Sequence, residues 1–224
     1  MKNEIIQLLK REWKLELRNK YTIGGIILYM VATVFVILNV LEQENMVHEL
    51  NAGWWNLLFW ISVLFVSVNA IAKSFYQESQ EKLLYLYTLF SPESVIISKM
   101  FYNYIFMFVL ALLSWSLFSI WFGNPVVQNT SFFLLLIFGA GGLGLIFTMI
   151  SSIASKAGNN TTLMAILSFP VILPLLVVLI RLSSLVYLQG PGMENTISLW
   201  IMLISLNVLI LSMSIILFPY LWRE

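Results

Sequence analysis

The sequence predicts an all-α, polytopic membrane protein with six transmembrane helices. Of its 224 residues, 60% are hydrophobic and only 10% are charged, and the mean hydropathy is +0.89. Soluble domains are about 45–50% apolar and about 25% charged, so a soluble fold is excluded. The apolar residues also fall into six stretches of about 20 residues, the length that crosses a hydrocarbon core about 30 Å thick.

Composition further limits the chemistry of the chain. The formal net charge is +1, which gives no reason to expect a nucleic acid partner. The chain has no cysteine, one histidine (His48) and no aspartate, so disulfides, thiolate metal sites and cysteine nucleophiles are excluded. We predict no metal site, no catalytic residues and no covalently bound cofactor.

The six spans follow one another in a single permease domain over 1–224. Each is too long for a strand, and short polar segments separate them. The first is not a cleavable signal peptide, because a polar-rich stretch precedes it and no small-residue cleavage pattern follows. The predicted spans are about 22–41, 54–74, 99–122, 132–154, 160–181 and 197–222.

Basic residues orient these spans. When successive loops are assigned to alternate sides, eleven of the twelve Lys and Arg residues lie on one side, and only Arg181 lies on the other. Because Lys and Arg are retained in the cytoplasm, we predict a bacterial inner-membrane protein with both termini cytoplasmic.

The N-terminal segment 1–21 is predicted to be an amphipathic helix that lies in the membrane interface and contacts lipid. Glu12 and Glu16 are one turn apart and fall within its apolar arc, where an unpaired carboxylate is costly. We therefore expect a cationic partner within the complex, for which Lys82 and Lys99 are candidates, although a plain surface anchor explains the pattern too. The apolar arc consists of Ile5, Ile6, Leu8, Leu9, Trp13, Leu15 and Leu17.

The connection 75–98 is the only long cytoplasmic loop, and its apolar residues recur at helical spacing. Such a helix between two spans is suited to contact a driving ATPase, and an interfacial helix without a partner is the alternative. The candidate coupling residues are Glu12, Glu16, Glu78, Glu81 and Lys82. A helix start signal ends the segment, with Ser91 as N-cap, Pro92 at the first helical position and Glu93 in the first turn.

The interiors of the predicted spans contain no ionisable residue. Proton relays and intramembrane catalysis depend on such residues, so a proton-driven carrier and a membrane enzyme are both disfavoured. The serines within the spans are interpreted as hydrogen-bonding groups between helices. No G-x-x-x-x-G-K-[ST] motif is present, so ATP would act only through a separate polypeptide.

Spans four and five contain the residues that favour conformational change. Span five has Pro170 and Pro174, which free backbone carbonyls and predict a kink or a local break. Span four is rich in small residues, which allow close helix approach, and ordinary bundle packing is the alternative interpretation of both spans. The glycines of span four are Gly139, Gly141, Gly142 and Gly144.

These residues together resemble the heme exporter protein B family, the ABC-type permease subunit of the cytochrome c maturation system. The resemblance covers essentially the whole chain. It is carried by REWKLELRNK before span one, EKLLYLYTLFSPESVIISK before span three, the glycine-rich span four that ends in SKAG, and FPVILPLL in span five. The stretch 87–92 is shorter and less proline-rich than the family pattern. Lys156 is a single basic residue at a place where the resemblance leads us to expect more positive charge.

The resemblance implies a permease that works with a cytosolic ATPase, a heme-handling membrane protein and a small membrane subunit, and that heme is the cargo. A second permease copy is a further candidate partner. A heme requires axial ligands and partners for its propionates, and the candidates on the outer face are His48, Trp54, Trp55 and Arg181. The alternatives are a solvated histidine, an aromatic belt, and an arginine that reaches the interface or pairs with Glu194.

Two other functions fit the same residues. One is a generic ABC-2 permease that exports lipid, polysaccharide or drug. The other is a membrane scaffold that transports nothing and uses the ATPase cycle to release heme from a partner.

Overall fold

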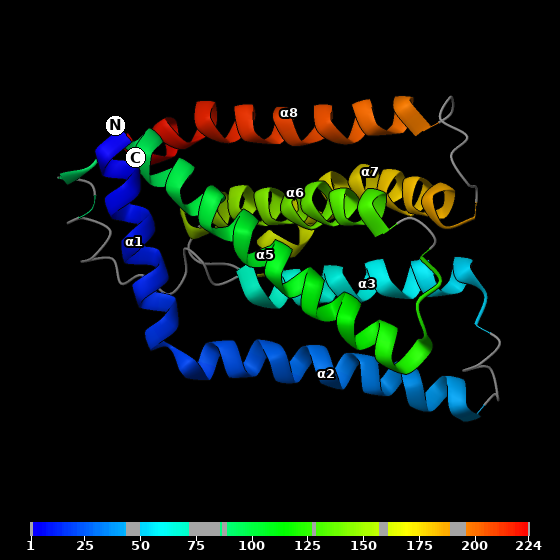
Figure 1. Ribbon diagram of the computed structural model, residues 1–224. Coiled ribbons are helices and arrows are strands. Elements are labelled where there is room, and N and C mark those ends of the chain that lie inside the picture. Colours follow the sequence, from blue (N-terminus) through cyan, green and yellow to red (C-terminus); the bar gives the residue numbers. More distant parts are fainter. Residues whose placement is uncertain are drawn as a thin grey trace.

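The computed structural model describes residues 2–43, 50–71, 86, 89–126, 129–156, 161–188 and 196–223. The described part is entirely helical and has no strands, which confirms the predicted fold class (Figure 1). Its helices are α1 (Lys2–Arg18), α2 (Lys20–Gln43), α3 (Ala52–Ile71), α5 (Pro92–Phe122), α6 (Asn129–Lys156), α7 (Thr161–Leu188) and α8 (Thr196–Arg223).

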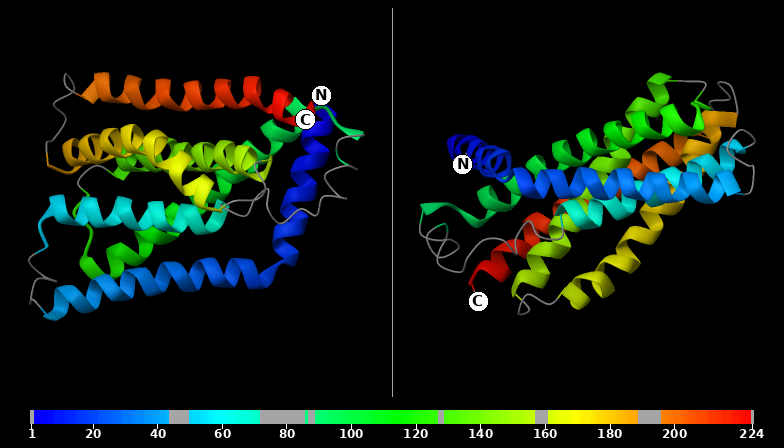
Figure 2. Two further views of the ribbon diagram at one scale, coloured as in Figure 1. Left: turned by 180° about the vertical axis from the view of Figure 1, so that it is seen from behind. Right: turned by 90° about the horizontal axis from the view of Figure 1, so that it is seen from below.

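Six of these helices, α2, α3, α5, α6, α7 and α8, are long and apolar enough to cross a membrane. They form one bundle, and α1 lies across the end of that bundle at a steep angle to α2 (Figures 1 and 2). The break between α1 and α2 falls at Asn19. An amphipathic helix perpendicular to the spans is the arrangement predicted for an interfacial segment.

Two helices extend beyond the spans predicted from the sequence. The helix of the third span begins at Pro92, at the predicted start signal, so the last part of the 75–98 connection is helical. With 31 residues, α5 is roughly 46 Å long, which exceeds the hydrocarbon core of about 30 Å. The helix of the fifth span, α7, continues beyond the predicted span end at 181, to Leu188. Arg181 lies within this helix with its side chain exposed.

The fourth span is the centre of the bundle. In α6, 78% of the span is buried inside the protein, against 17% to 50% in the other spans. The helix packs against α3, α5, α7 and α8, and Figure 2 shows it enclosed by them. In contrast, α2 buries a single stripe of residues, Ile26, Met30 and Val34.

The two ends of the bundle differ. Both chain termini lie at the end where α1 crosses the bundle (Figure 1). At the opposite end, Trp55, Phe59, Phe118 and Phe132 form an aromatic cluster between α3, α5 and α6, with ring centroids 5.2–6.5 Å apart. The polar contacts at the α1 end and the aromatic packing at the far end therefore hold different parts of α5.

Candidate functional site

The contact between α1 and the first third of α5 contains the most concentrated charge in the described structure. We call it the α1–α5 joint. On α1, Glu4, Leu8, Glu12 and Glu16 recur every four residues and so lie along one side of the helix. Leu8 is only 2% exposed. The joint residues on α5 and just before it are Ser91, Ser94, Lys99 and Tyr102.

A buried ion pair lies at the centre of the joint. The Lys99 Nζ is 3.5 Å from the Glu12 Oε1, and the two side chains are 2% and 13% exposed. Arg11 adds a second cation 3.2 Å from the same carboxylate oxygen. The prediction that Glu12 requires a cationic partner is confirmed, and Lys99 provides it. The other candidate, Lys82, lies outside the described residues, as do Glu78 and Glu81.

The ends of the joint are held by hydroxyl and aromatic groups. The Ser91 hydroxyl donates to the Glu4 carboxylate at 3.1 Å and lies 2.7 Å from the Ser94 hydroxyl. Ser91 is the N-cap residue of α5, but its side chain makes no capping hydrogen bond. Further along, the rings of Trp13 and Tyr102 meet edge to face, with centroids 5.6 Å apart. These contacts were not predicted, because helical spacing within α1 does not reveal which residues of α5 lie opposite.

Burial and hydrogen bonding shift two carboxylates of α1 in opposite directions. Burial is the main cause that raises the pKa of Glu16 above its ordinary value of 4.5, and the charge of Glu12 raises it further. The Lys99 ammonium acts in the opposite sense. Hydrogen bonds from Ser94 and Ser91 lower the pKa of the Glu4 carboxyl. The joint thus contains Glu4, whose lowered pKa favours the charged carboxylate, and Glu16, whose raised pKa favours the neutral carboxyl.

The residues that follow Lys99 on α5 contact the glycines of α6. A Cβ atom at Gly144 would lie 3.0 Å from the backbone oxygen of Asn103, and one at Gly141 would overlap the Tyr104 ring. The Asn103 amide donates to the Thr148 hydroxyl at 2.8 Å. Since the Thr148 hydroxyl donates in turn to the Gly144 carbonyl at 2.6 Å, α5 and α6 are joined by both close packing and hydrogen bonds.

The other two glycines face the remaining neighbours of α6. A Cβ atom at Gly139 would meet Leu179 of α7 and Trp60 of α3, and one at Gly142 would meet Asn207 of α8. The four glycines therefore allow close approach to every helix around α6. In α7, Pro170 and Pro174 are exposed, and the helix continues without a break through both of them.

A buried polar network between α3 and α7 was not predicted as a unit. The Asn56 side chain, 0% exposed, donates to the Ile180 carbonyl at 2.9 Å and to the Ser184 hydroxyl at 3.0 Å. It accepts from the Ser183 hydroxyl at 2.5 Å, and Trp60 donates to that hydroxyl at 3.1 Å. An asparagine in an apolar span signals such a network, because its amide needs partners away from water.

The residues considered for heme contact lie at the end opposite the α1–α5 joint, as far as the structure describes them. Trp54 is 62% exposed and Arg181 is exposed. Trp55 is 1% exposed and donates to the Gly123 carbonyl at 3.1 Å, so its ring is within the aromatic cluster. His48 lies outside the described residues. The described residues contain no group of three or more His, Asp or Glu that could hold a metal ion.

The fold and the joint define a multi-pass helical membrane protein whose polar side chains connect one helix to another. The particular family is given by comparison with known families. The chain belongs to the CcmB family, because the family model described as CcmB protein matches residues 3–220, essentially the whole chain. This is the heme exporter protein B family of permeases, which have a role in cytochrome c maturation. Comparison with curated proteins gives no match.

Proposed function

We propose that the chain is the permease subunit of an ABC-type complex that handles or exports heme for cytochrome c biogenesis. The family match over residues 3–220 carries this proposal. Heme is then a cargo that passes through the complex. ATP is hydrolysed by a separate subunit, because this sequence has no phosphate-binding G-x-x-x-x-G-K-[ST] motif.

The α1–α5 joint supports a mechanical role for the chain. A cytosolic ATPase that presses on α1, or on the segment before α5, would act on α5 through the Glu12–Lys99 pair and the Glu4–Ser91 hydrogen bond. The movement would then reach α6, because the Asn103 backbone packs directly on Gly144. The proposed coupling residues are Glu12, Glu16, Glu78, Glu81 and Lys82.

This proposal places the chain in the bacterial inner membrane with both termini and α1 on the cytoplasmic side. Its partners would be the ATPase, a heme-handling membrane protein of the cytochrome c maturation system, and a second permease copy. The outer end would meet heme through His48, Trp54 and Arg181, whereas Trp55 is buried in the aromatic cluster and does not reach a ligand at the surface. Loss of heme-dependent absorbance from the assembled complex on His48→Ala would support this heme contact, and an unchanged spectrum would exclude His48 as a ligand.

Deletion of the gene in a bacterium that makes c-type cytochromes tests the function. We expect loss of covalently bound heme in c-type cytochromes, while b-type cytochromes stay at their normal level because heme synthesis is intact. Normal c-type cytochromes in the deletion strain would contradict the proposal. Purification of the tagged chain should also recover an ATPase together with a heme-binding membrane protein.

Two further measurements separate the proposed function from its alternatives. Recovery of an ATPase without any heme-binding partner would favour a generic ABC-2 permease for lipid, polysaccharide or drug. ATP-dependent release of heme from the partner, without heme uptake into inverted vesicles that contain the complex, would favour a scaffold over a transporter.

A further inference from the structure

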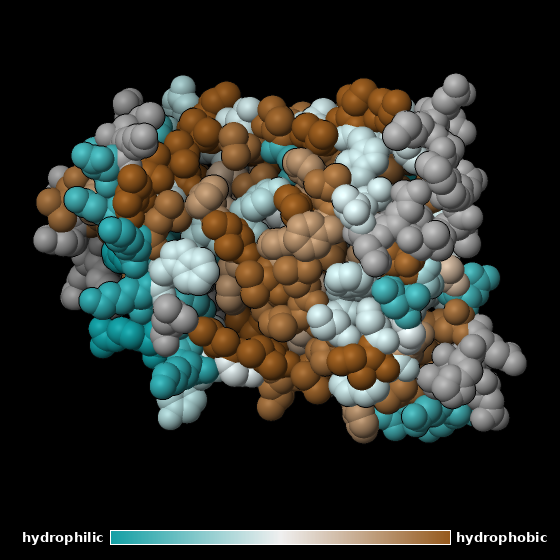
Figure 3. Space-filling model, in the orientation of Figure 1, coloured by the Kyte–Doolittle hydropathy of each residue, from teal (hydrophilic) through white to brown (hydrophobic). Residues whose placement is uncertain are grey.

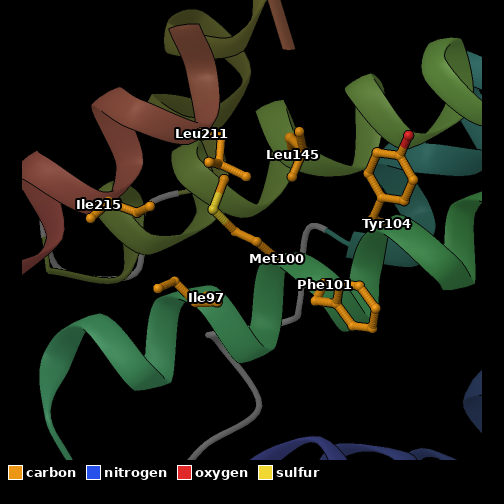
Figure 4. Close-up of a pocket in the computed structure, with 7 residues that line it drawn as sticks. All are labelled: Ile97, Met100, Phe101, Tyr104, Leu145, Leu211 and Ile215. Carbon is orange, nitrogen blue, oxygen red and sulfur yellow. The ribbon is translucent and has the colours of Figure 1, made fainter. Parts of the chain in front are cut away.

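A lateral groove separates α5 from α8 on the side of α5 that faces away from α1. Its volume is about 410 Å³, within the range of ligand sites in proteins. Side chains from three helices point into it, and Met100 extends from α5 toward Leu211 on α8 (Figure 4). The lining residues are Ile97, Met100, Phe101, Tyr104, Leu145, Leu211 and Ile215.

The groove has a closed floor and an open rim. Met100 and Leu145 are 1% and 4% exposed and form the floor, whereas Phe101 and Leu211 are 53% and 41% exposed and form the rim. The face around the rim is apolar over α5 and α8, and the hydrophilic surface gathers over α1 (Figure 3). Because α5 and α8 are both long and apolar enough to cross a membrane, we infer that the groove opens toward the hydrocarbon of the bilayer.

The lining determines which kind of molecule fits. Among the described residues, the lining contains no charged side chain, and the hydroxyl of Tyr104 is the only polar side-chain group there. A phosphate or carboxylate in the groove would therefore be buried without a partner, at a high cost in free energy. A hydrocarbon chain would instead restore the dispersion contacts that the walls of an empty cavity lack.

We propose that this groove binds an acyl chain of a membrane phospholipid. The groove is bounded by the part of α5 around Lys99, from Ile97 to Tyr104, so the chain would enter close to the level of α1. Its floor is the α5–α6 contact, where the Tyr104 ring packs over Gly141. An acyl chain here would fill the space between α5 and α8 next to the α1–α5 joint. This site is separate from the proposed heme contacts and from the coupling residues.

Photolabelling tests the proposal. The purified full-length chain is reconstituted in vesicles of phosphatidylethanolamine and phosphatidylglycerol that contain a phosphatidylcholine with a diazirine on one acyl chain. After irradiation, we expect the label on peptides that contain 97–104 and 211–215, in excess of the label on the exposed face of α2 around Leu28 and Val36. Equal labelling of the groove and of α2 would overturn the proposal.

Filling variants make the test specific. Leu211→Trp and Ile215→Trp place an indole in the groove, and either should remove the label from the 97–104 peptide. Leu209→Trp is the matched control, because Leu209 is 53% exposed on α8 and does not line the groove, so this variant should keep the label. Full labelling in a folded Leu211→Trp or Ile215→Trp variant would contradict the proposal.

Heme is the competing occupant, since Met100 and Tyr104 carry the two atoms in the lining that can ligate iron. Equimolar hemin is added to the labelling reaction to test this. We expect the labelling of the groove to persist. Loss of the label together with a hemin absorbance band that Leu211→Trp abolishes would assign the groove to the cargo and overturn the acyl-chain proposal.

Discussion

Lys99 is a buried ammonium group, and its surroundings explain how a cation is tolerated there. An isolated charge in an apolar environment costs several kcal/mol, and a partner in good geometry offsets that cost. Glu12 is that partner, at 3.5 Å, and Glu16 interacts electrostatically with both. The cluster of Glu12, Glu16 and Lys99 therefore has two potential negative charges and one positive charge. Removal of any of these residues changes the net charge buried at the joint.

Replacement of Lys99 alone should destabilise the protein. Lys99→Met removes the buried cation beside Glu12 and leaves that carboxylate only the more exposed Arg11. We therefore expect a loss below the about 3–5 kcal/mol that a fully unpaired buried charge costs. Replacement of both residues, in Lys99→Met with Glu12→Gln, should recover much of that loss because no buried charge is left unpaired. The midpoint of thermal unfolding in detergent measures the effect. Lys14→Met is the control, since Lys14 is exposed on α1. Equal midpoints for Lys99→Met and Lys14→Met would show that the pair contributes nothing.

The Glu16 carboxyl should give the joint a pH dependence. Its pKa is raised above 4.5 in the folded protein, mainly by burial, so the folded state binds this proton more tightly than the unfolded state does. The resulting stabilisation is present at low pH and is lost as the pH rises through the raised pKa. Glu16→Gln should abolish this loss and make the protein more stable than wild type at pH 7.

This prediction is checked by the midpoints of thermal unfolding of wild type and Glu16→Gln. They are measured over a pH range that begins about one unit above the ordinary glutamate pKa. In that range Glu4 adds no pH dependence to the unfolding midpoint. Its pKa is lowered in the folded protein, so it affects stability only as the pH falls below 4.5, the ordinary pKa of glutamate. Parallel pH profiles for the two proteins would show that Glu16 is not the group responsible.

At the scale of helices, the glycines of α6 determine how closely the neighbouring helices pack against it. The six spans have similar mean hydropathies, from 1.6 to 2.6, so hydropathy alone does not reveal which helix is central. The glycines do indicate it, because small residues permit close approach of neighbouring backbones. At Gly144 the neighbour is the backbone of Asn103, which cannot move without displacing α5.

Gly144→Ala should therefore weaken the contact between α5 and α6. A Cβ atom there would lie 3.0 Å from the Asn103 carbonyl oxygen, so the two helices would have to separate and the Asn103–Thr148 hydrogen bond would lengthen. Destabilisation of about 1–3 kcal/mol is expected, as for other overpacked sites.

Gly24→Ala is the matched control for Gly144→Ala. Gly24 is also within a helix, but nothing lies within 4 Å of a Cβ atom at that position. Alanine there should stabilise the protein by about 0.5–1 kcal/mol, because glycine is the poorer helix former. Unfolding midpoints compare the two variants. Equal effects would show that α5 and α6 are less closely packed than the structure indicates.

The sequence predicted the elements better than the contacts between them. Span number and the start of α5 at Pro92 follow from local patterns, namely hydropathy and a proline at the first helical position. The need of Glu12 for a cation follows from its place in an apolar arc, but the choice of Lys99 depends on how α1 crosses α5 in space. The Asn56 network depends likewise on the packing of α3 against α7, which no pattern within one helix determines. The extension of α7 to Leu188, beyond the predicted span, likewise does not follow from hydropathy alone.

At the scale of the whole molecule, the arrangement connects one end of the bundle to its centre. Helix α1 is held on α5 by the joint, α5 is packed on α6 through Gly141 and Gly144, and α6 contacts each of the other central helices. A force applied to α1 thus has a continuous path of packed residues to the middle of the bundle. Contiguous packing makes such coupling physically feasible, and it matters for function only if α1 faces the compartment that holds the ATPase.

The orientation of α1 is the last prediction. Basic residues are enriched at the end of the bundle that carries α1 and both termini, and the positive-inside rule places that end in the cytoplasm. The natural chain has no cysteine, so single cysteines report position without background. In intact spheroplasts, a membrane-impermeant maleimide should label Asn51→Cys and Thr130→Cys, which are exposed at the opposite end. It should label Lys14→Cys only after permeabilisation. The reverse pattern would place α1 outside the cell and exclude contact between the joint and a cytosolic ATPase.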